Sequence, residues 1–148
     1  MVQSIIVKDF DLKKTITSGH FFSYEEKNDG YLIYNNKEFF VKQEKNKLFY
    51  EGISKKDLIF FFDLDKDLSK LYTTKDPILK KAIKQNKGVR LVRANLRITI
   101  ISFILSSNNN MKRIKKMVDF LRKKKFKIPS EQILRDTGFG YSSRSQSK

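Results

Sequence analysis

The 148-residue chain contains no cysteine, two prolines and a single histidine, His20. Without cysteine it can form neither disulfide bonds nor thiolate–metal sites, and this composition fits a reducing cellular interior. One imidazole cannot supply a metal site built from histidines. We therefore expect an intracellular, cytoplasmic chain with no metal and no other cofactor.

Long apolar runs are also missing. The amino terminus offers only residues 5–7, too few for the apolar core of a signal peptide. The apolar stretch at residues 97–105 is far shorter than the about 18 residues that a membrane-spanning helix needs. We expect no membrane partner.

Positive charge is abundant and lies in one half of the chain. The formal net charge is +16. Residues 1–76 contain 13 lysines and 13 acidic residues, whereas residues 77–148 contain 19 lysines and arginines and only three acidic residues. Such a one-sided field suits a polyanionic partner.

The first third of the chain is typical of β-structure. We predict a β-meander over residues 1–52, because aromatic and β-branched residues dominate four segments, at residues 21–24, 31–34, 39–41 and 48–50. The run Asn28-Asp29-Gly30 predicts a two-residue hairpin turn, since Asp-Gly readily adopts positive φ. Alternating apolar residues imply one buried face, which helices must cover.

Helix signals follow the sheet. Ser54, with Asp57 three residues later, predicts the capped start of a helix over residues 54–62. Asp76 before Pro77 predicts another helix start. Residues 98–105 fit a buried strand or a buried helix equally well. Beyond residue 111, apolar residues at helical spacing alternate with many basic ones, which predicts a basic amphipathic helix.

Between the last two segments lies a polar corner that ends in Asn108, Asn109 and Asn110. Short amide side chains favour a turn or a helix N-cap. On spacing alone, this is an ordinary connector between two helices without a ligand. A tight polar corner before a basic helix can also push a side chain into a nucleic-acid duplex, and the spacing leaves both interpretations open.

A resemblance favours the second interpretation. Residues 87–93, residues 101–110 and the pair Arg113-Ile114 are similar in order, spacing and identity to the 8-oxoguanine DNA glycosylase family. The similarity covers about residues 8–144 and is strongest over residues 87–114. It also implies that residues 98–105 are helical.

In this family a Ser-Gly-x-x-Phe segment places a glycine carbonyl against the oxidised base, where it accepts the N7 hydrogen that guanine lacks. Here the resemblance implies lesion-base recognition by Ser18, Gly19 and Phe21. A residue without Cβ lets the backbone approach a flat ligand closely, although a turn glycine entering a strand explains Gly19 equally simply. The family usually has glutamine where His20 stands.

The resemblance also implies contacts with double-stranded DNA that carries oxidised guanine opposite cytosine. Asn108 would fill the space of the flipped base, Arg113 would hydrogen-bond the unpaired cytosine, and Tyr141 would wedge beside it. The family's second cytosine-reading arginine falls at Ser142. Further DNA contacts are expected at Asn109, Asn110, Lys112 and Lys116.

The family's catalytic lysine is not among these residues. It lies in a helix-hairpin-helix segment with a Leu-Pro-Gly-Val-Gly-like signature downstream of Gly-Phe-Gly-Tyr, and this sequence contains no such signature in the seven residues after Tyr141. Amine catalysis needs a desolvated lysine, so we name no catalytic residue. A separate chain carrying the catalytic half is a possible partner.

The expected fold class is α+β. An antiparallel β-sheet N-terminal domain with packed helices (residues 1–66) precedes a partial all-α helix-hairpin-helix glycosylase domain (67–141) and a disordered tail (142–148). We expect damaged-DNA binding in base-excision repair, with no glycosylase or lyase activity by the chain alone. The alternatives are a non-enzymatic basic nucleic-acid-binding module and an interaction domain for an acidic protein.

Overall fold

The computed structural model describes residues 1–107 and 109–124. An antiparallel five-stranded sheet with the order β1-β5-β4-β3-β2 forms one part of the molecule. Its strands are β1 (Gln3–Ile6), β2 (Tyr24–Lys27), β3 (Gly30–Tyr34), β4 (Glu38–Glu44) and β5 (Lys47–Glu51). The helices are α1 (Leu12–Thr17), α2 (Lys55–Phe62), α3 (Pro77–Asn86), α4 (Leu96–Ser106) and α5 (Met111–Lys123), with a 3₁₀ helix, η1 (Ser69–Tyr72). The α+β class is confirmed.

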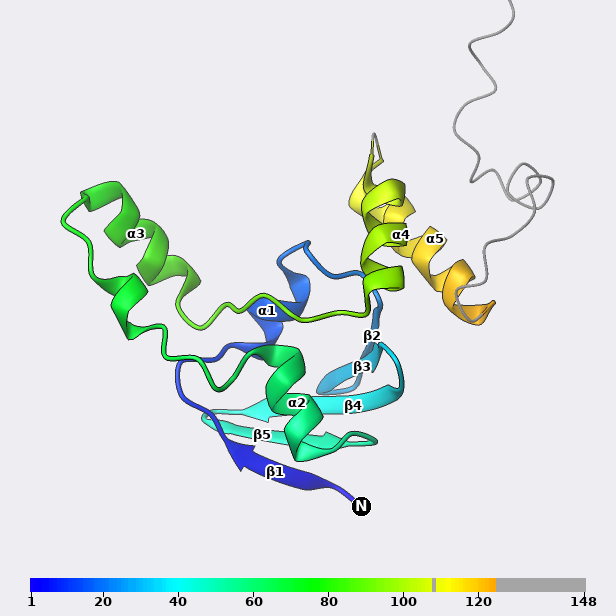
Figure 1. Cartoon of the computed structure of the whole chain (residues 1–148), viewed down its shortest axis with the longest axis horizontal. Coiled ribbons are helices and arrows are strands. Elements are labelled where there is room, and N and C mark those ends of the chain that lie inside the picture. Colours follow the sequence, from blue (N-terminus) through cyan, green and yellow to red (C-terminus); the bar gives the residue numbers. More distant parts are fainter. Residues whose placement is uncertain (108, 125–148) are drawn as a thin grey trace, which may run out of the picture.

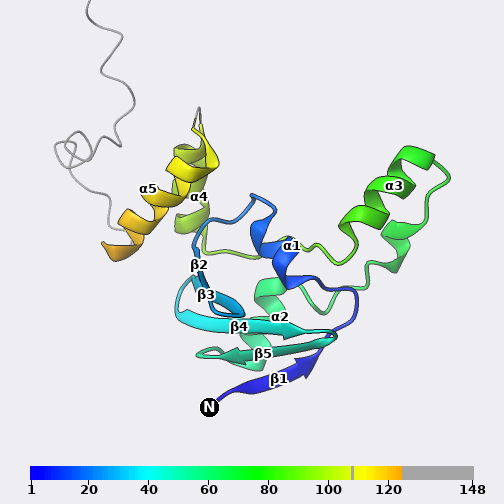
Figure 2. The same ribbon diagram turned by 180° about the vertical axis from the view of Figure 1, so that it is seen from behind.

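The elements are spread along the long axis of the molecule. Figure 1 shows α3 at one end and the pair α4 and α5 at the other, with α1 and α2 next to the sheet between them. The view from behind gives the same order, reversed (Figure 2). None of the helices in the described part of the chain is long and apolar enough to cross a membrane.

The main core lies between the sheet and α2. Phe61 packs edge to face on Phe39 and Phe21, with ring centres 5.3 and 5.7 Å apart. Residues from alternate positions of β3, β4 and β5 join it, including Ile33, Val41, Leu48 and Tyr50. The sheet therefore buries one face, as its sequence pattern predicts.

Both predicted helix starts are confirmed. The backbone N–H of Asp57 donates to Ser54 Oγ at 3.1 Å, which caps α2. Asp76 Oδ1 accepts from the backbone N–H groups of Ile78 and Leu79 at 2.7 and 3.1 Å, and Pro77 is the first residue of α3. In each case a side-chain oxygen satisfies amide groups that have no partner within the helix.

Two local predictions are wrong, and a third is confirmed with a shift of one residue. The meander over residues 1–52 is interrupted by α1, whose N-cap Asp11 accepts from the backbone N–H of Lys14 at 2.9 Å. The segment at residues 21–24 is paired only from Tyr24 onward. The predicted two-residue hairpin turn is confirmed, but it consists of Asn28-Asp29, with a φ of 46° at Asn28, because Gly30 already pairs with Lys27.

Gly30 is required for packing instead of for the turn. A Cβ at this position would lie 2.6 Å from both the Phe40 ring and the Val41 carbonyl oxygen. The neighbouring strand β4 therefore lies too close to Gly30 for any side chain at this position.

A second, smaller core joins α4 and α5 to the loop that precedes β2. Its buried members are Phe22, Ile98, Ile114, Val118 and Leu121. The apolar stripe predicted for α5 is therefore buried, except at Met111, which is exposed. The ambiguous residues 98–105 lie in a helix, as the resemblance implied.

Candidate nucleic-acid interface

The segment at residues 87–93 is held in place by a buried arginine. Arg90 Nη1 donates to the carbonyl oxygens of Asp63 and Lys66 at 2.6 and 2.9 Å. The backbone of the same segment binds α1, because the N–H of Asp11 donates to the Gly88 carbonyl at 2.8 Å. Gly88 has a φ of 86°, and a Cβ there would lie 2.9 Å from the Asp11 nitrogen. The segment at residues 87–93, which is part of the family resemblance, is thus fixed to α1 and to the residues after α2.

The loop of residues 18–22 leaves α1 and runs beside that segment. Gly19 has a φ of 88°, a left-handed backbone that glycine adopts without strain. Ser18 Oγ donates to the Thr15 carbonyl at 3.0 Å, and the Val92 N–H donates to His20 Nε2 at 3.3 Å. Residues on both sides of Gly19 are therefore tied down.

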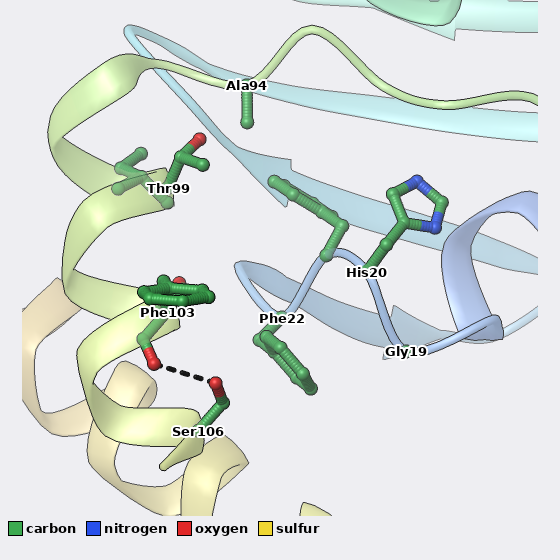
Figure 3. A pocket seen from close by; sticks show the side chains of 10 residues that line it. Gly19, His20, Phe22, Ala94, Thr99, Phe103 and Ser106 are labelled. Carbon is green, nitrogen blue, oxygen red and sulfur yellow. Dashed lines mark hydrogen bonds between the residues drawn. The ribbon is translucent and has the colours of Figure 1, made fainter.

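A cavity of about 200 Å³ lies between this loop and α4. Figure 3 shows Gly19, His20 and Phe22 on the loop side and Thr99, Phe103 and Ser106 on the helix side. Phe21, Ala94, Ile98 and Ser102 complete the lining. The Ser102 hydroxyl is buried and has no hydrogen-bond partner among the described residues, so a polar group entering the cavity could bind it.

Of the three predicted lesion-recognition residues, Gly19 and Phe21 line the cavity and Ser18 does not. Ser18 and Gly19 are on the loop, and Gly19 lines the cavity. Phe21 also touches the cavity, but it is only 3% exposed and its ring packs into the sheet core against Phe61. Sequence reasoning missed Phe22, although the Ser-Gly-x-x-Phe spacing starting at Ser18 points to Phe22 and not to Phe21.

The polar corner is built by the amide side chains that the structure describes. Asn110 accepts from the backbone N–H of Arg113 at 3.0 Å and so caps α5, as predicted. Asn109 Nδ2 donates to the Leu105 carbonyl at 2.8 Å, which satisfies the end of α4. Asn108 and Tyr141 lie outside the described residues.

The basic residues of α5 form two sets. Lys112, Arg113 and Lys116 are exposed, as a phosphate contact requires. Lys115 and Arg122 instead lie over aromatic rings of the sheet: the Lys115 ammonium is 4.2 Å from the ring centre of Tyr24. The second set serves packing, which its sequence positions alone do not reveal.

The fold and these features define a class: an α+β domain in which a basic helical hairpin stands beside a small cavity. The model of the 8-oxoguanine DNA glycosylase, N-terminal domain family matches residues 4–99, and the chain belongs to this family. No curated protein matches the sequence.

Solved structures agree with this family. The chain is 33% identical to MBOgg1, in a structure with a low-affinity DNA ligand, with a TM-score of 0.71 and coverage of 78% of this chain and 43% of that one. It is 25% identical to the Clostridium acetobutylicum 8-oxoguanine glycosylase/lyase in its apo-form, with a TM-score of 0.65 and coverage of 78% and 46%. A complex of that enzyme with dsDNA containing cytosine opposite 8-oxoG gives the same identity and TM-score, with coverage of 78% and 45%. The chain thus spans less than half the length of these solved relatives.

Proposed function

We propose that this chain is the damaged-DNA-binding part of an 8-oxoguanine DNA glycosylase/AP lyase. One observation carries the proposal: α4 connects the cavity with the polar corner. Ser106 lines the cavity, and Asn108 follows two residues later. A protein that flips a base out of a duplex needs a pocket for the base and a side chain for the vacated space, close together. This hairpin supplies both.

We assign the remaining roles from the resemblance to the family. Asn108 fills the base stack, while Arg113 and Tyr141 contact the unpaired cytosine. Lys112 and Lys116 bind phosphate on the exposed side of α5, with Asn109 and Asn110 holding the corner in shape. On the cavity side, the Gly19 carbonyl reads the oxidised base, supported by Ser18 and Phe21, and Phe22 joins them.

We further propose that the chain does not cleave DNA by itself. It would work with a separate chain that carries the helical, catalytic half of the family's fold. Two helices support this partner. Helix α4 exposes large apolar side chains: Phe103 and Ile104 are 74% and 63% exposed. In α3 the apolar residue Ile78 is 78% exposed. Exposed apolar helix faces are typical of interaction surfaces, so the exposed apolar residues of α3 and α4 fit a further layer of helices.

Binding to matched duplexes tests the DNA proposal. We expect tighter binding to a duplex with 8-oxoguanine opposite cytosine than to the same duplex with guanine. Asn108→Ala and Arg113→Ala should each cost about 1–3 kcal/mol of this preference. Lys56→Ala, at an exposed position of α2, is the control and should change nothing.

Each competing function has its own outcome. Equal binding to both duplexes with a steep salt dependence indicates the non-enzymatic basic module. No duplex binding at physiological salt indicates an acidic protein partner. A covalent complex trapped with borohydride on the lesion duplex contradicts the proposed inactivity of the chain alone.

A further inference from the structure

We infer that His20 is the positioning residue of the base-reading loop: in its neutral form, with the proton on Nδ1, it ties Gly19 to the segment at residues 87–93. The inference rests on the proposed function for its effect on DNA, and on the structure alone for the tie itself. Two contacts carry it. Val92 N–H donates to His20 Nε2 at 3.3 Å, and His20 Nδ1 lies 2.5 Å from Ser18 Oγ.

The direction of these hydrogen bonds fixes the form of the ring. A backbone N–H can only donate, so Nε2 must carry a lone pair and no proton. The Ser18 hydroxyl donates to the Thr15 carbonyl at 3.0 Å, which leaves Ser18 Oγ to accept. Nδ1 therefore carries the proton and donates to Ser18. The chain of bonds runs from Val92 through His20 and Ser18 to α1, and it encloses Gly19.

This tie is anchored at both ends. On one side Ser18 reaches the last turn of α1. On the other side Val92 follows Arg90, whose guanidinium binds the carbonyl oxygens of Asp63 and Lys66. The His20 ring thus connects two fixed segments, α1 and residues 87–93. The Gly19 carbonyl lies in the same loop as His20.

Protonation breaks the tie, because an imidazolium has no acceptor for the Val92 N–H. Burial lowers the pKa of His20 from its ordinary value, so the neutral form prevails at neutral pH. Apart from His20 itself, the residues that line the cavity carry no charge. The elements around the loop carry mostly basic groups: Lys13 and Lys14 in α1, Lys87, Arg90 and Arg93 in the segment at residues 87–93, Arg97 in α4, and Lys112, Arg113, Lys115, Lys116, Arg122 and Lys123 in α5. The acidic groups on these elements are Asp11, which pairs with Lys14 at 3.5 Å, and Asp119, which pairs with Arg122 at 3.7 Å.

Glutamine can replace this tie without responding to pH. Its amide oxygen accepts as Nε2 does, and its NH₂ group donates as Nδ1–H does. His20→Gln should therefore preserve the position of Gly19, whereas His20→Ala removes both bonds. Comparing His20→Gln with His20→Ala therefore tests whether the hydrogen bonds of His20 position Gly19.

The first experiment is nuclear magnetic resonance of the full chain without DNA. His20 is the only histidine, so its ring signals are unambiguous. At about pH 8 we expect a proton on Nδ1 and none on Nε2. The amide signals of Gly19 and Val92 should then shift with the His20 titration as the pH falls. A proton on Nε2, or amide signals that ignore the titration, overturns the inference whatever the DNA result.

The second experiment measures the preference for lesion over undamaged duplex. The unmodified chain should show a preference at about pH 8 that falls about tenfold at about pH 5, because one hydrogen bond is lost. His20→Gln should hold its preference at both values, and His20→Ala should lack it at both, with affinity for undamaged duplex unchanged. A preference that survives in His20→Ala overturns the inference. If the unmodified chain has no preference at about pH 8, the proposed function fails, and the resonance experiment alone decides on the tie.

Discussion

The guanidinium of Arg122 lies 3.9 Å from the ring centre of Tyr34. The phenol of Tyr34 donates to Glu25 at 3.0 Å, and Arg122 Nη2 lies 3.9 Å from the same carboxylate. Burial raises the pKa of Tyr34 to about 12, so the phenol stays a neutral donor. Helix α5 is thus attached to the sheet by a cation, a ring and a carboxylate.

Because Arg122 packs on the sheet and Lys116 is exposed, we expect Arg122 to contribute to stability and Lys116 to DNA binding. Arg122→Ala should lower the free energy of unfolding by about 1 kcal/mol, because it removes the cation–π contact. Lys116→Ala should leave stability unchanged and reduce the slope of log affinity against log salt by about 1. Urea unfolding and salt-dependent binding to duplex DNA measure the two effects. A salt slope that falls for Arg122→Ala while its stability holds contradicts this division.

Arg90 should tolerate no replacement by lysine. Its guanidinium uses two nitrogens: Nη1 donates to the carbonyl oxygens of Asp63 and Lys66, and Nη2 donates to that of Asp9. The single ammonium nitrogen of lysine cannot occupy both nitrogen positions. We expect Arg90→Lys to cost about 3 kcal/mol of stability in urea unfolding. Arg97→Lys, on the exposed surface of α4, should have no measurable effect. Equal stability of both variants would show that Arg90 does not hold the segment at residues 87–93.

Asp63 should make the fold sensitive to acid. Burial raises the pKa of its carboxyl, but hydrogen bonds and charges from Lys66 and Arg93 outweigh this and lower it overall. The ion pairs therefore stabilise the fold above the unfolded-state pKa of about 3.9, and this contribution is lost as the pH falls through the lower folded-state value. Asp63→Asn keeps the left-handed backbone, φ 54°, that asparagine also accepts. It should be less stable than the unmodified chain at about pH 7 and equally stable near about pH 2. A constant difference across this range would exclude the ion pairs as its cause.

Local signals allowed much of the fold to be predicted. The caps at Ser54, Asp76 and Asn110 depend on side chains within three residues of the amides that they bind. The stripe of α5 depends on spacing alone. Such features need no knowledge of distant residues.

The missed features depend on contacts between distant residues. Helix α1 is short and contains β-branched residues, but Thr15 and Ile16 are buried beneath segments from far along the chain. Gly30 resembles a turn residue until β4 is placed against it. Lys115 and Arg122 resemble solvated charges until the rings of β2 and β3 lie beneath them. Tertiary context decides each case, and a single sequence does not display it.

The exposed apolar faces give the last prediction, which concerns the proposed catalytic half. Along α4 the exposed apolar residues are Leu96, Ile100, Phe103 and Ile104, whereas Ile98, Ile101 and Leu105 pack in the second core. Glutamate at a solvent-exposed position changes the stability of the lone chain little, but glutamate buried in an interface carries a large desolvation cost.

Co-expression with the part of the Clostridium acetobutylicum enzyme that this chain does not cover separates these two situations. Ile104→Glu and Ile78→Glu should leave the thermal midpoint of the lone chain within a few degrees and weaken co-purification at least about tenfold, because each places an unpaired charge in the interface. Lys80→Glu, on the other side of α3, is the matched control and should co-purify like the unmodified chain. If the unmodified chain forms no complex, or if all three variants bind equally, helices α3 and α4 do not carry the catalytic half. Their apolar faces would then serve another purpose.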